Sequence, residues 1–379
     1  MNHVPRALGA AAALVAVIPL APIPASAAGI ERAVPSTRVL FREGNYAEFN
    51  LAHVRPHLTG RGANLSPIGR SVEVVGFTGN LFEDYTQLGL AVKSDITERI
   101  SYALILDEPV GADTRYGEGN FLGTFTYAGT RADFDSIALT GILAYDVTPQ
   151  IKAYGGLRAQ RLRARAAIPF INNYTVVADP DWSYGYMLGA AYQLPEIALR
   201  VALTYYSRIS HSHDTRELGQ FDTRTDIETP QSVNLEFQTG IAEDTLAFGS
   251  VRWVDWSSFR IAPPVYGQIT AAATGEARAL VDYDDDWWTY TLGLGYRFDP
   301  QLSGAVQASF EPSVGGELTT LGPIDGRSSL GGSLTYEIGN VELTGGLTVG
   351  RFGSTRNILN TEFRNGTFTA LGLRVGFTF

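Results

Sequence analysis

Period-two alternation of apolar side chains constrains this chain more than any other feature of its sequence. In the last segment, large apolar residues and threonines occupy every second position from Thr367 to Phe379, and mostly small or polar residues lie between them. Alternate residues of a β-strand face opposite sides, whereas a helix would spread both sets around its surface. The segment therefore predicts a strand with one apolar face and one face suited to water.

The same alternation returns along the chain and predicts about fourteen strands. The predicted strands are 46–60, 85–96, 99–109, 129–147, 150–168, 183–194, 196–210, 229–240, 244–261, 286–298, 301–312, 327–338, 340–354 and 366–379. Short turns such as 147–150 alternate with long polar links such as 207–228 and 262–285. Outer-membrane barrels combine short periplasmic turns with longer external loops, so this alternation predicts an even strand number and periplasmic termini.

Composition supports strands rather than helices as the membrane-crossing elements. The mean hydropathy is −0.01, and the chain contains 41 glycines, 18 tyrosines and 19 phenylalanines but no cysteine. Intermediate hydropathy with abundant glycine and aromatic residues is typical of strands that face lipid on one side and a wet lumen on the other. We therefore predict an all-β, transmembrane antiparallel β-barrel over residues 46–379, with a soluble periplasmic β-protein as the alternative.

The two ends of the chain and its charge define further expectations. Arg6, an apolar run from Ala7 to Leu20 and the A-x-A pattern at Ala25–Ala27 predict a signal peptide over residues 1–28. The formal net charge of −10 argues against nucleic-acid binding, which requires clustered basic residues. Trp287, Trp288 and Tyr290 open one strand, and Tyr296 and Phe298 close it, so we expect them in two interfacial aromatic girdles.

Three arginines fall on the inward register of their predicted strands. Arg158, Arg200 and Arg374 are candidates for ligand binding in the lumen, because a guanidinium offers a bidentate fork to a carboxylate. The alternative is that they pair with lumen carboxylates such as Asp107 and line a packed interior.

One strand contains a break. Pro109 cannot donate to a ladder and Gly111 permits a bend, so both predict a kink or bulge in the barrel wall. Such a break would open a lateral path from lumen to lipid, whereas the simpler interpretation is the start of an external loop.

Metal and catalytic sites have weaker support. Asp284, Asp285 and Asp286 would suit calcium or a divalent bridge to lipopolysaccharide, with a solvated loop as the alternative. His211 and His213 share one strand face and would suit a metal, with solvated loop residues as the alternative. No nucleophile motif is present, so we expect neither an enzyme nor a cofactor.

Several stretches resemble the long-chain fatty acid transporter (FadL-type, OMPP1/FadL/TodX) family of outer-membrane proteins. They are Ser36–Tyr46, Ile105–Asp113, Ala153–Arg158, Thr229–Ser232 and Trp253–Phe259, and together they span most of the chain after the signal peptide. The resemblance implies a fourteen-stranded barrel, an N-terminal hatch plugging the lumen and a lateral break in the third strand, where Pro109 and Gly111 lie. One departure is that residues 29–45 are too few for the usual hatch and lack its Asn-Pro-Ala pattern, so we expect a shortened hatch there.

The resemblance also implies passive uptake of long-chain fatty acids or similar hydrophobic molecules across the Gram-negative outer membrane. The alternative is a general diffusion porin for small solutes, which an open lumen would favour. Expected partners are the hydrophobic ligand, lipopolysaccharide and outer-membrane lipid, and the barrel-assembly machinery through the C-terminal Phe379.

Overall fold

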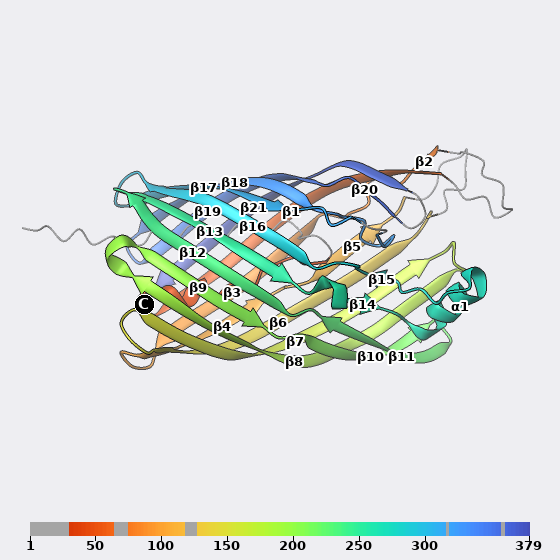
Figure 1. Ribbon diagram of the computed structural model, residues 1–379, viewed down its shortest axis with the longest axis horizontal. Helices are drawn as coiled ribbons and strands as arrows, with labels where there is room; N and C mark the ends of the chain where they lie inside the picture. The colour runs from red at the N-terminus through yellow and green to blue at the C-terminus, as the bar shows by residue number, and fades with distance from the viewer. Residues whose placement is uncertain (1–29, 64–74, 118–126, 316–317, 358–360) are drawn as a thin grey trace, which may run out of the picture.

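The computed structural model describes residues 30–63, 75–117, 127–315, 318–357 and 361–379. The predicted signal peptide lies outside these residues. The predicted fold is confirmed: fourteen antiparallel strands close into one barrel (Figure 1). The wall strands are β1 (Tyr46–Ala63), β3 (Tyr85–Asp95), β4 (Ile100–Asp107) continued by β5 (Gly111–Arg115), β6 (Arg131–Asp146), β7 (Ile151–Ile168), β8 (Tyr174–Leu194), β9 (Leu199–Tyr206) continued by β10 (Ile209–Glu217), β11 (Phe221–Thr229) continued by β12 (Ser232–Ala242), β13 (Thr245–Val254), β16 (Trp287–Arg297), β17 (Leu302–Glu311), β18 (Arg327–Ile338), β19 (Val341–Phe352) and β21 (Glu362–Thr378).

The first and last strands close the barrel. Tyr46 of β1 pairs with Lys93 of β3 on one side and with Thr378 of β21 on the other. Closure leaves no free sheet edge, which a membrane could not satisfy with hydrogen bonds. Both ends of the barrel domain lie at the same rim (Figure 1).

The predicted two-faced strands are present throughout the wall. On β21, Leu371 and Phe377 are exposed on the outer face, while Phe368, Ala370 and Arg374 are buried in the interior. One aromatic prediction was wrong: Trp287 is only 3% exposed and faces inward, while Trp288 and Tyr290 face outward as expected. The period of two explains this difference, because neighbouring residues of one strand cannot both face lipid.

The predicted link 207–228 was also wrong, because it contains the hairpin of β10 and β11. Likewise, β8 begins at Tyr174 rather than near residue 183. The outer face of β10 carries Ser210, Ser212, Asp214 and Arg216, and the inner face carries histidine, threonine and glutamate as well as isoleucine. Both faces are polar, so the alternation in hydrophobicity that identifies the other strands is absent.

Short elements complete the fold. They are η1 (Arg38–Phe41), β2 (Val75–Phe77), η2 (Pro195–Ile197), η3 (Trp256–Ser258), β14 (Arg260–Ile261), helix α1 (Pro264–Thr274), β15 (Val281–Asp282) and β20 (Thr355–Arg356). Over the described ranges, no helix has the length and apolarity needed to cross a membrane.

Candidate transport pathway

An apolar cavity lies inside the external part of the barrel. The space between atoms here is about 610 Å³, part of it open to solvent, and carbon atoms form nearly all of the cavity surface. The wall strands β5–β8, β10 and β11 line one side, and the loop between β13 and β16 lines the other. Residues that line it include Phe134, Ala164, Val176, Ala178, Thr215, Ile227, Ile261, Leu280, Tyr283 and Leu321.

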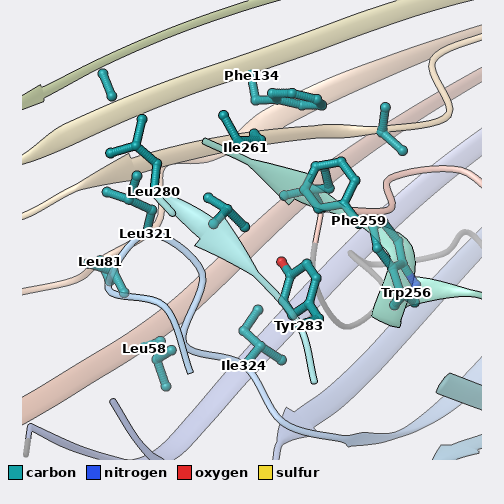
Figure 2. Close-up of a cluster of buried hydrophobic side chains, with 14 of the residues drawn as sticks. Leu58, Leu81, Phe134, Trp256, Phe259, Ile261, Leu280, Tyr283, Leu321 and Ile324 are labelled. Atoms are coloured by element: carbon teal, nitrogen blue, oxygen red, sulfur yellow. The ribbon is translucent and has the colours of Figure 1, made fainter. Parts of the chain in front are cut away.

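The loop between β13 and β16 folds into the barrel and packs beside this cavity. Its strands β14 and β15 pair with each other through Ile261 and Val281. Trp256, Phe259 and Tyr283 pack together, with ring centroids 5.4 to 6.0 Å apart, and Figure 2 shows them beside Ile261, Leu280 and Leu321. Burial raises the pKa of the Tyr283 phenol, so this group stays neutral.

Glu217 holds helix α1 of that loop. Its carboxylate is fully buried and accepts hydrogen bonds from the backbone N–H groups of Val265 and Tyr266, at 3.1 and 3.0 Å. The Tyr174 hydroxyl donates to the same carboxylate at 2.7 Å. A carboxylate at a helix N-terminus satisfies free N–H groups and matches the helix dipole. The wall hairpin thereby fixes the inward loop.

The segment 30–45 precedes β1 and, together with the wall, lines a second, more polar cavity. The space between atoms there is about 1710 Å³, part of it open to solvent. Arg42 donates two hydrogen bonds to Glu342 at 2.6 and 2.5 Å, and Arg38 donates to Glu236 at 3.1 Å. Arg252 on β13 forms a buried ion pair with Glu31. We refer to residues 30–45 as the hatch segment.

The hatch segment contacts the wall where β4 gives way to β5. The backbone N–H of Arg32 donates to the carbonyl of Pro109 at 2.9 Å, and that of Gly111 donates to the carbonyl of Ile30 at 2.7 Å. The Arg32 guanidinium also pairs with Asp113 at 2.5 Å. A Cβ atom on Gly111 would lie 2.6 Å from this guanidinium, so glycine leaves room for the Arg32 side chain in this position.

Pro109 and Gly111 therefore lie at a break within a continuing wall strand, and not at the start of an external loop. The ladder with β3 ends at Leu90↔Leu106, and on the other side pairing with β6 shifts by one residue between Asp107↔Ala138 and Gly111↔Asp135. At the break, the Ser136 hydroxyl accepts from the Val110 N–H at 3.0 Å and donates to its carbonyl at 2.7 Å. A side chain thus replaces the backbone ladder.

The three candidate arginines lie inside the barrel, outside the set of residues that line the apolar cavity. Arg158 donates to Asp107 and to Thr140, each at 2.7 Å. Arg200 donates to Gln238 at 2.7 Å and stacks over Phe41. Arg374 donates to Thr344 at 3.3 Å and lies 3.7 Å from Glu342. Each guanidinium therefore has a polar partner from the chain itself.

The acidic residues Asp284, Asp285 and Asp286 lie in a loop, whereas His211 and His213 lie on strand β10. Asp286 accepts hydrogen bonds from the Trp253 indole at 3.1 Å and the Ser257 hydroxyl at 2.7 Å, while Asp284 and Asp285 lie in the same loop. Within the described residues, no three His, Cys, Asp or Glu side chains are grouped to hold a metal ion. His211 and His213 are 1% exposed and face inward, which corrects their interpretation as solvated loop residues.

A barrel with a lumen crossed by its own N-terminal segment, an apolar cavity and a broken wall strand defines an outer-membrane transport protein for hydrophobic compounds. The family model for the outer membrane protein transport protein (OMPP1/FadL/TodX) matches residues 89–338. The chain belongs to this family and resides in the outer membrane. No curated protein matches the sequence.

Solved structures show the same fold at low sequence identity. A Pseudomonas aeruginosa FadL homologue is 12% identical, with a TM-score of 0.67 over 90% of this chain and 92% of that one. The P. putida toluene transporter TodX is 11% identical, with a TM-score of 0.64 over 90% and 92% of the two chains. The Ralstonia pickettii toluene transporter TbuX is 14% identical, with a TM-score of 0.60 over 90% of each.

Two residues of the lumen, Glu31 and Arg252, were not identified from the sequence. Glu31 and Arg252 are 221 residues apart in the chain, and neither belongs to a local motif. Arg252 does follow the inward register of its strand, beside the outward-facing Trp253. The inward register was the one signal in the sequence, and it does not indicate which residue pairs with Arg252.

Proposed function

We propose that this protein passes small neutral hydrophobic molecules, such as monocyclic aromatic compounds, in preference to ionised long-chain fatty acids. The observation that carries this proposal is the chemistry of the apolar cavity. Among the described residues that line it, the charged side chains are Asp133 and Arg165, which pair with each other at 2.7 Å at its edge. Arg165 is 69% exposed on its side chain and points toward the outside.

A bound carboxylate would have no cation inside this cavity. Burying an ion without a partner carries a large cost in free energy, whereas a neutral ring is stabilised by the apolar area that it buries. The arginines that would attract an acid, including Arg158 and Arg374, lie elsewhere and already contact polar groups of the chain. The cavity thus favours neutral solutes.

The proposed route leads from the external loops to the apolar cavity and out through the break at Pro109 and Gly111. Movement is passive and leaves the substrate chemically unchanged. A general porin is not favoured, because the hatch segment crosses the polar part of the lumen and the inward loop fills its external part. Contacts with lipopolysaccharide, and with the assembly machinery through Phe379, belong to the same proposal.

Filling the cavity tests this function. Ala164 faces the cavity, so Ala164→Trp should lower the uptake of a labelled neutral aromatic compound by cells that lack their own transporter. The control is Ala308→Trp on the lipid-facing side of β17, where an aromatic side chain is tolerated. Parental uptake by a folded Ala164→Trp protein would contradict the proposed path through this cavity.

A further inference from the structure

The wall between β8 and the strand formed by β9 and β10 contains a second interruption. β8 pairs with β9 from Leu194↔Leu199 to Met187↔Tyr206, and with β10 only from Ala178↔Thr215 to Val176↔Glu217. In the described structure, no ladder pair joins residues 179–185 to residues 208–214. We refer to these two stretches as the β8–β10 seam.

The local sequence accounts for the missing ladder. Asp179 and Pro180 form a bulge, because the register with β7 shifts there by one residue, and proline has no N–H to donate. On the opposite side, Ser207 and Arg208 separate β9 from β10. A Cβ atom on Gly185 would lie 2.6 Å from the Ile209 side chain, so the two strands contact each other here through a side chain.

Two histidines close the seam from the lumen side. The His213 Nδ1–H donates to the carbonyl of Asp179 at 2.7 Å, and the His211 Nδ1 lies 3.1 Å from the Asp181 carboxylate. The two rings stack with centroids 5.7 Å apart. Both Nε2 atoms are buried without a hydrogen-bond partner among the described residues. Side chains therefore close this part of the wall.

The seam lies between the apolar cavity and the membrane interface. Ala178 and Thr215, the first ladder pair beyond it, both line the cavity. On its outer face, Trp182, Tyr184 and Tyr186 are 52%, 77% and 48% exposed. Exposed tryptophan and tyrosine on a barrel wall are typical of the boundary between lipid and water.

We propose that the β8–β10 seam is a lateral port, separate from the break at Pro109 and Gly111, that exchanges neutral hydrophobic molecules between the apolar cavity and the membrane interface. This inference rests on the proposed function. Separating two laddered strands in lipid leaves their N–H and C=O groups without partners. Over the seam the ladder is already absent, so opening it requires that His211 and His213 move away from β8 and that the Gly185–Ile209 contact separates.

Cross-linking across the seam tests the port. The native chain has no cysteine, so Tyr184→Cys with Ser210→Cys places one thiol pair on the outer face, next to the Gly185–Ile209 contact. Joining this pair with a short bis-maleimide, to which both thiols add, should lower the uptake of a labelled neutral aromatic compound several-fold. The control is Ala308→Cys with Leu330→Cys, a lipid-facing pair on the fully laddered β17 and β18. Uptake that is equal in the two cross-linked proteins would overturn the port.

Removing the histidines provides the second measurement. The double variant His211→Ala, His213→Ala should raise uptake several-fold, and His53→Ala, His57→Ala on the exposed face of β1 should not. Unchanged or lower uptake by a folded His211→Ala, His213→Ala barrel would show that these histidines do not close the seam. If the parent protein takes up no neutral compound, the proposed function fails and the port fails with it. If the parent transports and the seam variants behave as the parent does, the port alone fails.

Discussion

Arg158 illustrates how buried charge is arranged in this barrel. Its guanidinium is 8% exposed, the Asp107 carboxylate is 13% exposed, and Thr140 accepts a further hydrogen bond. The inward position was predictable from the alternation of β7, and Asp107 was one of the predicted alternatives as a partner. Whether Arg158 binds a ligand or pairs within the wall depends on its contacts with Asp107 and Thr140 on two other strands. Strand periodicity does not specify such contacts.

Breaking that pair should destabilise the barrel. Arg158→Ala leaves Asp107 buried without its cation, and loss of one partner of a buried ion pair costs about 3 to 5 kcal/mol of unfolding free energy. Urea unfolding in detergent measures this loss. The double variant Arg158→Met, Asp107→Asn should recover most of the stability. Equal stability of Arg158→Ala and the parent would show that the pair is not structural.

At the scale of elements, the hatch segment and the inward loop fill a lumen that would otherwise be open. The sequence predicted a strand from residue 46 and a short hatch over residues 29–45. No pattern in those residues indicates that Glu31 and Arg32 contact the barrel wall. Helix α1 lies within the predicted link 262–285, and its position depends on Glu217 from another hairpin. Such contacts join distant parts of the chain and leave no local pattern.

Releasing the hatch segment should open the polar part of the lumen. Glu31→Gln removes the charge that holds Arg252, which leaves a buried cation with weaker partners. We expect larger and more frequent ion-conducting openings in planar bilayers. Glu43→Gln, at an exposed position of the same segment, is the matched control. Identical conductance of Glu31→Gln and Glu43→Gln would show that this ion pair does not hold the hatch.

For the whole molecule, strand number and closure were predictable because each wall strand carries its own alternation over at least part of its length and each periplasmic turn is short. The hairpin of β10 and β11 was missed because both of its faces are polar, and the same hairpin supplies His211, His213 and Glu217. Architecture thus followed from repeated local signals, whereas the parts that we propose to set selectivity came from exceptions to them. The hairpin of β10 and β11 lines part of the apolar cavity.

We propose above that this cavity selects neutral hydrophobic molecules. The most direct test compares uptake of a labelled neutral aromatic compound with uptake of a labelled long-chain fatty acid, in the same cells at neutral pH, with and without this protein. We expect faster uptake of the aromatic compound when the protein is present and little change for the ionised acid. Fast uptake of the fatty acid with no effect on the neutral compound would contradict it.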